Sequence, residues 1–293
     1  MYNLFYVESP LQMLSAISAV NKFDQYKAIL IVDVSHDDRV NNNEQLLKCI
    51  GNEWHQVYIK KPRKGWAKTL KGMGLIKDII NLCYFSLKYR REIDRYFIGE
   101  YRSIDMAILN CFIMPKETIL LDDGTFTITA QNHHITNKIP PYINGTKYKL
   151  FKPLLKNLAT PNLYSFFDLE SSLQKGQINY FELPRQKKMM INKGEIFFFG
   201  AKFSESKFMS MSDEIGVLSK IVKLFTGYEI FYVPHRDEKK SKINKISDLG
   251  FRIKSLGKPA EIYFDETAEM PEIVLSYYST VLYTCYIRFN NVK

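Results

Sequence analysis

The chain has 293 residues, of which 46% are hydrophobic and 14% aromatic, enough to build the cores of one large or two small domains. Its four cysteines are scattered without a C-x-x-C pair, which excludes a disulfide framework and a structural zinc site. The formal net charge of +10 favours an anionic partner, and the positive charge is densest between Lys60 and Arg102.

The sequence predicts a cytoplasmic protein. Its N-terminal segment has no basic region, and Glu8 and Pro10 interrupt the apolar residues, so we expect no signal peptide. No stretch of about 18 or more residues stays apolar, so no membrane-spanning helix is expected. The basic segment Lys60–Arg102 is either a solvated helix surface or a contact for the anionic inner face of the cell membrane.

Strands and helices are predicted to alternate along the first half of the chain. Ser9 and Pro10 supply an N-cap and a favoured first helical residue after the aromatic and β-branched run 2–7. The spacing of apolar residues predicts one long amphipathic helix over 66–91. The predicted strands are 2–7, 28–34, 55–59, 95–98 and 118–121, and the other predicted helices are 10–21 and 43–50. This β-α-β rhythm indicates a parallel sheet with helical crossovers.

The rhythm starts again after a polar, basic linker predicted over 184–193. Strands are predicted at 195–199, 229–233 and 272–275, with helices at 213–225 and after Ser279. We therefore expect two Rossmann-like α/β domains, an N-terminal one over residues 1–185 and a C-terminal one over residues 190–293. Only thirteen residues follow Thr280, so we expect a short final helix or a trimmed C-terminus.

In the first half of the chain, polar residues follow two predicted strands, at the ends where open α/β sheets bind ligands. They are Glu8, Ser9, Pro10, Leu11 and Gln12 after the first strand, and Asp122, Asp123 and Gly124 after the fifth. Two adjacent carboxylates at a glycine turn suit a general base, although an ordinary Asp-Gly turn has the same sequence.

In the second half, His235 follows the strand 229–233 and Pro234, and Arg236 places a permanent charge beside it. This pair suits a phosphate leaving group. Ser279 and Thr280, at the start of the last helix, offer hydroxyl and backbone N–H groups to a phosphate, unless they only cap the helix. The remaining candidates are Gly200, Ala201 and Lys202 after the strand 195–199, where the backbone could approach a nucleotide.

The sequence gives no support to a metal site or to several common classes of enzyme. His133 and His134 are adjacent in a predicted polar loop without companion carboxylates, so we interpret them as surface residues and expect no metal site. The sequence contains no G-x-G-x-x-G, Walker A, G-x-S-x-G or H-E-x-x-H motif. This argues against the usual dinucleotide, NTP, serine-hydrolase and zinc-protease sites.

The order of these clusters resembles the motif set of bacterial sialyltransferases. An acid-acid-glycine motif, a histidine after a proline-ended strand and a Ser-Thr pair occur in the order found in glycosyltransferase family 52 and the related polysialyltransferases. The resemblance covers nearly the whole chain. It departs from the family at Arg236, because the family has a proline after the histidine. It implies a GT-B-type fold of two Rossmann-like domains that face a central cleft.

The resemblance implies an inverting, metal-independent sialyltransferase without a cofactor. Asp122 or Asp123 would deprotonate an acceptor hydroxyl group, which attacks the anomeric carbon of CMP-sialic acid, and His235 would bind or protonate the departing phosphate. The other implied donor-site residues are Gly200, Ala201, Lys202, Pro234, Arg236, Ser279 and Thr280, with Glu261 and Glu269 as weaker candidates for the ribose. Ser9, Pro10 and Gln12 would lie on the acceptor side. The implied acceptor is a surface polysaccharide or lipooligosaccharide with a terminal galactoside, which could be lipid-linked.

Two alternatives stay open. A GT-B glycosyltransferase of the same architecture could use another donor, such as a UDP-sugar, a GDP-sugar or CMP-Kdo. A non-catalytic protein could instead bind anions or nucleic acid through the basic segment Lys60–Arg102. That segment lacks interleaved stacking residues on a strand and no nucleic-acid motif is present, so we expect no specific nucleic-acid partner.

Overall fold

The chain forms two compact units, Met1–Glu182 (unit 1) and Leu183–Lys293 (unit 2), each built on its own parallel sheet. The computed structural model describes residues 1–36, 39–62, 71–137, 141, 146–167, 169, 178–180, 189–267 and 269–289. The first part of the expected linker, 184–188, lies outside the described residues. Its last part is wrong, because residues 190–193 already belong to the first strand of unit 2.

Unit 1 contains a seven-stranded sheet in which every neighbouring pair is parallel. Its strands are β1 (Tyr2–Val7), β2 (Lys27–Asp33), β3 (Gln56–Lys60), β4 (Ile93–Ile98), β5 (Glu117–Leu121), β6 (Asn162–Ser165) and β7 (Ile178–Tyr180), in the order β3-β2-β1-β4-β5-β6-β7. The carboxyl ends of all these strands lie along one edge. The order reverses between β1 and β4, which makes the crevice beside them the switch point where such sheets bind ligands.

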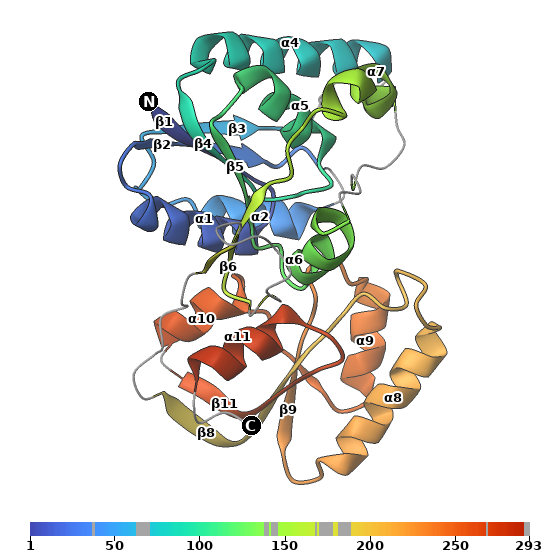
Figure 1. The fold of residues 1–293 in the computed structure, drawn as a ribbon. Coiled ribbons are helices and arrows are strands. Elements are labelled where there is room, and N and C mark those ends of the chain that lie inside the picture. Colours follow the sequence, from blue (N-terminus) through green and yellow to red (C-terminus); the bar gives the residue numbers. More distant parts are fainter. Residues whose placement is uncertain are drawn as a thin grey trace. The chain divides into compact units, whose positions relative to one another are not determined.

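Helices cover both faces of this sheet, as Figure 1 shows. One face carries α1 (Pro10–Lys22) and α2 (Val40–Lys48), and the other carries α4 (Lys71–Tyr89) and α5 (Ile104–Ile113). α7 (Thr146–Leu155) packs against α5, while α6 (Phe126–Thr129) leads into the π-helix η1 (Ala130–Ile135). Because both faces are covered, the central strands are apolar almost throughout, and the run from Asn3 to Val7 is buried.

Alternate strand residues of unit 1 point to the same face and form a core with α1. Phe5 stacks on Phe97, with ring centroids 4.3 Å apart, and both pack in the cluster that contains Met13 and Ala16 of α1. α1 begins where Ser9 accepts a hydrogen bond from the backbone N–H of Gln12, and Pro10 occupies its first position. The core and the cap together fix the first turn of α1 at the carboxyl edge of the sheet.

Unit 2 repeats this plan at a smaller size. Its strands are β8 (Met190–Phe199), β9 (Glu229–Val233), β10 (Arg252–Ile253) and β11 (Glu269–Ser276), in the order β10-β9-β8-β11. One face packs against α8 (Met211–Leu224) and α9 (Lys240–Asp248), and the other against α10 (Ala260–Thr267) and α11 (Thr280–Arg288), as seen in Figure 1. All neighbouring strands are parallel, and the order reverses between β8 and β11.

The structure confirms the predicted α/β alternation, and each predicted strand occurs within a few residues of its expected bounds. The helix predicted over 66–91 is α4, although 66–70 lie outside the described residues. Elements that the sequence pattern did not predict are β6, β7, β10, α5, α6, η1, α7, α9 and α10. Within the part of the chain that the structure describes, no helix combines the length and the apolar composition needed to cross a membrane.

Candidate functional site

Polar side chains collect at the carboxyl edge of the unit 1 sheet, around the switch point. Glu8 follows β1, Glu100 follows β4 and Asp123 follows β5. Glu100 is 8% exposed and Glu8 9%, so these carboxyl groups are nearly removed from water. Burial in a low dielectric disfavours the charged form of a carboxyl group, which bears on Glu8. Burial and the Glu100 carboxylate raise the pKa of Glu8 to about 7.

Gln12 connects β1 to the acidic motif. Its Oε1 accepts a hydrogen bond from the backbone N–H of Glu8 at 2.8 Å, and its Nε2 donates to Asp123 Oδ1 at 2.8 Å. Gln12 is 1% exposed. Of the acceptor-side candidates, Ser9 and Pro10 build the start of α1, and Gln12 reaches the acidic motif from it.

Asp123 is the more accessible carboxylate of the acidic pair. Its side chain is 20% exposed, and its Oδ2 lies 3.6 Å from a guanidinium nitrogen of Arg102. Burial and the neighbouring carboxylates of Glu100 and Glu8 raise the pKa of Asp123 to about 7. A carboxylate with this pKa is suited to accept a proton at neutral pH. Gly124 has a φ of 62°, so the glycine permits the turn that brings Asp123 out of β5.

Asp122 points into unit 1 instead. It is fully buried, and its two carboxyl oxygens accept hydrogen bonds from the Ser165 hydroxyl at 2.7 Å and from the Phe166 backbone N–H at 2.8 Å. Burial raises the pKa of Asp122 to about 7 despite these hydrogen bonds. Both oxygens tie β5 to the end of β6. This geometry favours a structural role for Asp122 and leaves Asp123 as the candidate base.

Three further residues of this edge, Gly99, Glu100 and Arg102, follow β4 and were not among the predicted site residues. At Gly99, a Cβ would lie 2.3 Å from Oε1 of Gln12, so a side chain here would displace that glutamine. Glu100 binds Arg102 through two hydrogen bonds of 2.8 and 2.5 Å, and the guanidinium lies 3.9 Å from the ring centre of Phe126. The sequence does contain a signal for this site, since a Gly-Glu pair directly follows the predicted strand 95–98.

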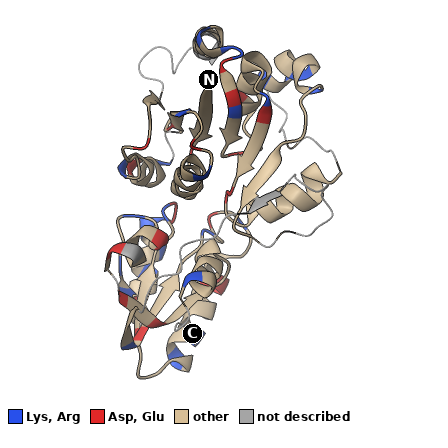
Figure 2. Ribbon diagram, turned by 60° about the vertical axis from the view of Figure 1, so that its left-hand side comes forward, with Lys and Arg blue, Asp and Glu red and all other residues tan. Residues whose placement is uncertain are grey.

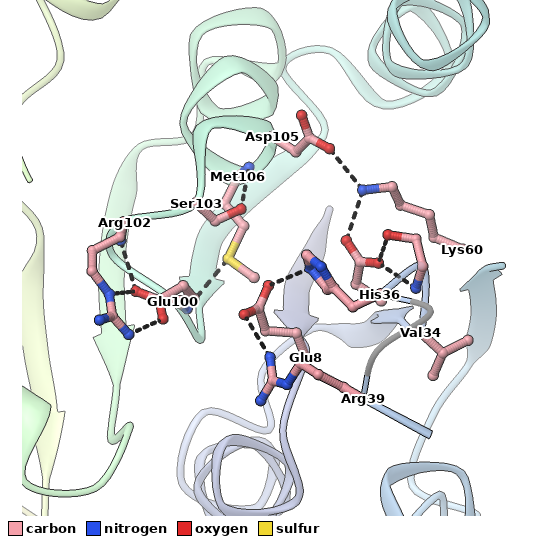
Figure 3. Close-up of polar contacts among 12 residues, drawn as sticks. Glu8, Val34, His36, Arg39, Lys60, Glu100, Arg102, Ser103, Asp105 and Met106 are labelled. Carbon is pink, nitrogen blue, oxygen red and sulfur yellow. Dashed lines mark hydrogen bonds and ion pairs between the residues drawn. The ribbon is translucent and has the colours of Figure 1, made fainter. Parts of the chain in front are cut away.

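A second group at this edge mixes acids and cations (Figure 3). Among the described residues, Glu8, Asp33 and His36 could hold a metal ion, because their ligand atoms lie within 4.8 Å of one another. Cations already pair with both acids, since Arg39 lies 3.4 Å from Glu8 and Lys60 lies 2.7 Å from Asp33. A metal ion would have to displace them, so the donor set is a poor fit for a resident ion.

The basic segment Lys60–Arg102 is partly neutralised within unit 1. Its ion pairs are Lys60 with Asp33 and Asp105, Arg95 with Asp94 and Glu117, and Arg102 with Glu100 and Asp123. In Figure 2, blue basic and red acidic residues are both scattered along the described ribbon. Residues 63–70 of this segment lie outside the described residues.

In unit 2, the candidate donor residues also gather at a carboxyl edge. His235 follows β9, Gly200 follows β8, and Ser279 lies three residues beyond β11, so the loops flank the switch point between β8 and β11. The backbone N–H of Gly200 donates to the carbonyl of Val233 at 2.9 Å, which joins the ends of β8 and β9. Lys202 is exposed and lies 3.6 Å from Asp237 in the loop after β9.

His235 is held as a neutral ring with a defined tautomer. The backbone N–H of Asp237 donates to His235 Nδ1 at 3.1 Å, so the proton of the neutral ring lies on Nε2. Burial and the neighbouring charges of Arg236, Lys202 and Lys242 lower the pKa of His235 to about 4. A neutral imidazole with Nε2–H is a hydrogen-bond donor. This favours binding of a phosphate over protonation of it.

Three of the remaining candidates of unit 2 belong to α11 or contact it, and the fourth lies at the amino edge of the sheet. Ser279 caps α11, accepting a hydrogen bond from the Val281 backbone N–H at 3.2 Å, and Thr280 is the first residue of that helix. Glu261 of α10 accepts a hydrogen bond from the Thr284 hydroxyl at 3.2 Å. Glu269 begins β11 and pairs in register with Met190, at the amino edge of the sheet. The structure therefore separates Glu269 from the other donor candidates.

His133 and His134 lie on the π-helix η1 and not in a loop. His133 is exposed as expected, but His134 is partly buried, and its ring lies 6.3 Å from that of Tyr101 and 6.4 Å from that of Phe126. His134 therefore packs beside the acidic turn.

No protein-family model matches the sequence, and no curated protein matches it significantly. Among solved structures, the chain is similar to an α/β-galactoside α-2,3-sialyltransferase of Photobacterium phosphoreum, with a TM-score of 0.51 and 13% identity over 100% of this chain and 88% of that chain. It is similar to the UDP-GlcNAc 2-epimerase of Methanocaldococcus jannaschii, with a TM-score of 0.51 and 12% identity over 96% of this chain and 80% of that chain. The corresponding enzyme of Neisseria meningitidis gives a TM-score of 0.50 and 10% identity over 96% and 79%. At these identities the likeness concerns the fold, and the chain has two Rossmann-like α/β domains of the GT-B type.

Proposed function

We propose that the chain is an inverting glycosyltransferase that uses CMP-sialic acid as its donor. The observation that carries the proposal is Asp123, a partly exposed carboxylate with a pKa of about 7 at the carboxyl edge of unit 1. The order of the sequence motifs supports the choice of donor, and the likeness to a sialyltransferase supports the fold that this reaction needs. The proposed base belongs to unit 1, and the proposed donor-binding groups belong to unit 2.

The proposed step is a single displacement at the anomeric carbon. The acceptor hydroxyl oxygen forms the new glycosidic bond while Asp123 takes the hydroxyl proton. The bond between the anomeric carbon and the phosphate oxygen breaks, and CMP leaves with the electron pair. Attack from the side opposite the phosphate inverts the configuration.

His235 would bind the departing phosphate through Nε2–H. Since the pKa of His235 is about 4, the ring is neutral at pH 7 and contributes a hydrogen bond without donating its proton. Lys202 and Arg236 would add positive charge, while Ser279 and Thr280 would offer the start of α11. Gly200, Ala201 and Pro234 would shape the loops around the nucleotide. These protein groups would supply the stabilisation that a divalent cation supplies in other transferases, so we propose a metal-independent reaction without a cofactor.

A transfer assay tests the reaction. The purified chain is incubated with CMP-sialic acid and a galactoside in EDTA, and the product is identified by mass spectrometry. We expect transfer in EDTA, because the proposed reaction needs no metal ion. A galactoside is used because we propose a terminal galactoside of a surface polysaccharide or lipooligosaccharide as the natural acceptor. Loss of transfer in EDTA that magnesium or manganese restores would contradict the metal-independent mechanism.

The donor has a specific alternative, because UDP-GlcNAc epimerases match the fold as well as the sialyltransferase does. The test compares the thermal stabilisation by CMP, UDP and GDP at equal concentrations. A nucleotide that binds the folded state raises the melting temperature by mass action. We expect the largest shift with CMP. A larger shift with UDP or GDP would favour the alternative donor, and salt-dependent duplex binding without a nucleotide effect would favour the non-catalytic alternative.

We also propose that unit 1 contacts the anionic inner face of the cell membrane. α4 has exposed apolar side chains at Ile80, Tyr84 and Leu87. At about 100° per residue they form one stripe, opposite the buried Ser86 and Tyr89 on the same helix. A helix with apolar side chains on both its inner and outer faces calls for a partner on the outer one.

α7 has a similar outer surface, with Leu150 59% exposed and Leu154 47% exposed. Both α4 and α7 pack against α5. Exposed basic residues accompany the two apolar stripes, namely Lys88, Arg90, Lys149, Lys152 and Lys156. Each basic side chain near an anionic lipid surface adds about 1 kcal/mol of attraction, so basic residues beside apolar stripes suit an anionic membrane.

Vesicle sedimentation tests this contact. We expect binding to vesicles that contain phosphatidylglycerol and little binding to vesicles of phosphatidylcholine alone. Leu87→Ser should weaken the binding, whereas Leu224→Ser, on α8 of unit 2, is the matched control because both leucines are 77% exposed. Equal binding by the two variants would contradict the proposal.

A further inference from the structure

A buried lysine lies beneath the two loops that carry the main donor candidates of unit 2. Lys242, on α9, is 0% exposed. Its Nζ lies 2.6 Å from Glu214 Oε1 and 2.9 Å from Glu238 Oε1. The same atom donates hydrogen bonds to the carbonyl of Ala201 at 2.7 Å and to Glu205 Oε2 at 3.2 Å. One ammonium group is thus shared by three carboxylates and a backbone carbonyl, which is unusual because lysine is seldom fully buried.

The three carboxylates link Lys242 to the surrounding backbone, because each of them also accepts a hydrogen bond from a backbone N–H group. Glu238 Oε2 accepts a hydrogen bond from the backbone N–H of His235 at 3.1 Å. Glu214 Oε2 accepts one from Ser204 N–H at 3.1 Å, in the loop after β8. The third, Glu205 Oε1, accepts one from Lys239 N–H at 3.1 Å, at the start of α9. The loop after β8 and the loop after β9 are therefore both anchored to the same buried charge cluster.

The cluster also explains why residue 200 is a glycine. The Tyr232 hydroxyl donates to Glu238 Oε1 at 2.8 Å, directly beneath this glycine. A Cβ at Gly200 would lie 2.3 Å from the Tyr232 oxygen and 2.8 Å from Glu238 Oε2. The absence of a side chain at Gly200 is thus required by the cluster below it, whether or not a nucleotide approaches from above.

A buried ion cluster of this kind adds little to stability compared with apolar residues of the same volume. The cluster instead orients the loop backbone, because each carboxylate accepts a hydrogen bond from a particular N–H group and fixes the backbone that carries it. Hydrophobic packing beneath the loops would leave their backbone orientation less well defined. The geometry is therefore better matched to holding loop backbone in place than to strengthening the core.

We propose that Lys242 is the positioning residue of the donor site: it holds the loops 200–206 and 234–238 in the arrangement that receives the donor phosphate. This inference rests on the proposed function, because it assigns the two loops to donor binding. Lys242 itself is fully buried, so it would act on the donor only through other residues. Its effect passes through Glu238 to the backbone of His235 and through the Ala201 carbonyl to the loop after β8.

The test replaces Lys242 with methionine in the full chain and uses Lys245→Met, an exposed lysine on the same helix, as the matched control. We expect Lys242→Met to weaken CMP binding by about tenfold or more in calorimetry, because misplaced binding groups lose most of their effect. Hydrogen exchange of the His235 and Ser204 backbone N–H groups should become faster. The His235 ring should titrate at a higher pH in NMR spectra, since one nearby cation is lost while Arg236, Lys202 and Asp237 stay.

A second variant guards against a folding failure of Lys242→Met. Glu238→Gln keeps the shape of the side chain but its amide nitrogen cannot accept a hydrogen bond, so it breaks one link of the cluster. We expect the same direction of change in CMP affinity and in His235 N–H exchange. Wild-type values for both in a folded Lys242→Met or Glu238→Gln variant would overturn the proposal.

The two proposals fail in different ways. If the wild-type chain binds none of CMP, UDP and GDP, the proposed function fails. The exchange rates still report whether Lys242 positions the loops, because this measurement needs no nucleotide.

Discussion

Gln12 aims the candidate base: its side-chain amide donates a 2.8 Å hydrogen bond to Asp123, 111 positions away in the sequence. The orientation of the amide is fixed, because its oxygen accepts the backbone N–H of Glu8 at 2.8 Å. The Nε2 group must therefore face Asp123. A residue in the first turn of α1 thus sets the position of a carboxylate at the end of β5.

The two aspartates of the motif should respond differently to substitution. Asp123→Asn removes the candidate base, and we expect the transfer rate to fall by about 10²-fold to 10⁴-fold, the usual contribution of a general base. Asp122→Asn keeps the shape, so the transfer rate should stay within about tenfold of wild type. Initial rates with CMP-sialic acid and a galactoside measure both, with circular dichroism to confirm folding.

The opposite pattern, with Asp122→Asn inactive and Asp123→Asn active, would show that the internal carboxylate acts on the substrate. That outcome would require the Ser165 and Phe166 hydrogen bonds to Asp122 to break during the reaction.

The pH dependence of kcat/KM should report the raised pKa of Asp123. The base must be ionised, so activity should rise with pH through about 7 and fall below it. Glu100→Gln removes a neighbouring negative charge that raises this pKa, and it also leaves Arg102 with one less anionic partner. Both effects stabilise the Asp123 carboxylate, so the acidic limb should move to lower pH. An acidic limb of Glu100→Gln that stays at the same pH or moves to a higher pH would contradict this assignment.

Gly99→Ala should disturb the site through Gln12. The new Cβ would lie 2.3 Å from Gln12 Oε1, so the glutamine or the strand end must shift, at a cost of about 1 to 3 kcal/mol. Thermal unfolding measures this loss of stability, and transfer assays should show a parallel loss of activity. Gly216→Ala, on α8, is the control, because nothing lies within 4 Å of its added Cβ and alanine should stabilise the helix by about 0.5 to 1 kcal/mol.

The His235 ring should be neutral in the ligand-free protein at pH 7. Its NMR titration is expected at about pH 4, with the proton of the neutral ring on Nε2. CMP should raise this pKa, since the phosphate charge stabilises the protonated ring. A ligand-free titration near the ordinary value of about 6.5 would show that His235 is solvated and is not held by Asp237 and its neighbours.

Strand-end reasoning from the sequence placed Gln12 and Asp123 at the same edge, because parallel strands bring their carboxyl ends together. It could not separate Asp122 from Asp123. That distinction depends on Ser165 and Phe166, which lie 43 and 44 residues away and reach Asp122 only when β6 pairs with β5. Tertiary pairing of this kind leaves no local sequence signal.

Lys242 was missed for a related reason. α9 spans Lys240–Asp248, a short polar segment whose only apolar residues are Ile243 and Ile246, so its sequence gives a weak helix signal, and its buried lysine depends on carboxylates supplied by other elements. Short elements such as β7 and β10, of three and two residues, likewise owe their existence to pairing with a neighbouring strand. The long apolar strands needed no such help, which is why their positions were predictable.

The reversal of strand order between β1 and β4 has an evolutionary consequence. The chain reaches this crevice by several independent loops, each attached to a strand whose side chains lie mostly in the core. A lineage can therefore exchange one loop and recognise a different ligand while the neighbouring loops and the sheet stay unchanged. Such modular divergence also erases sequence likeness faster than it erases architecture.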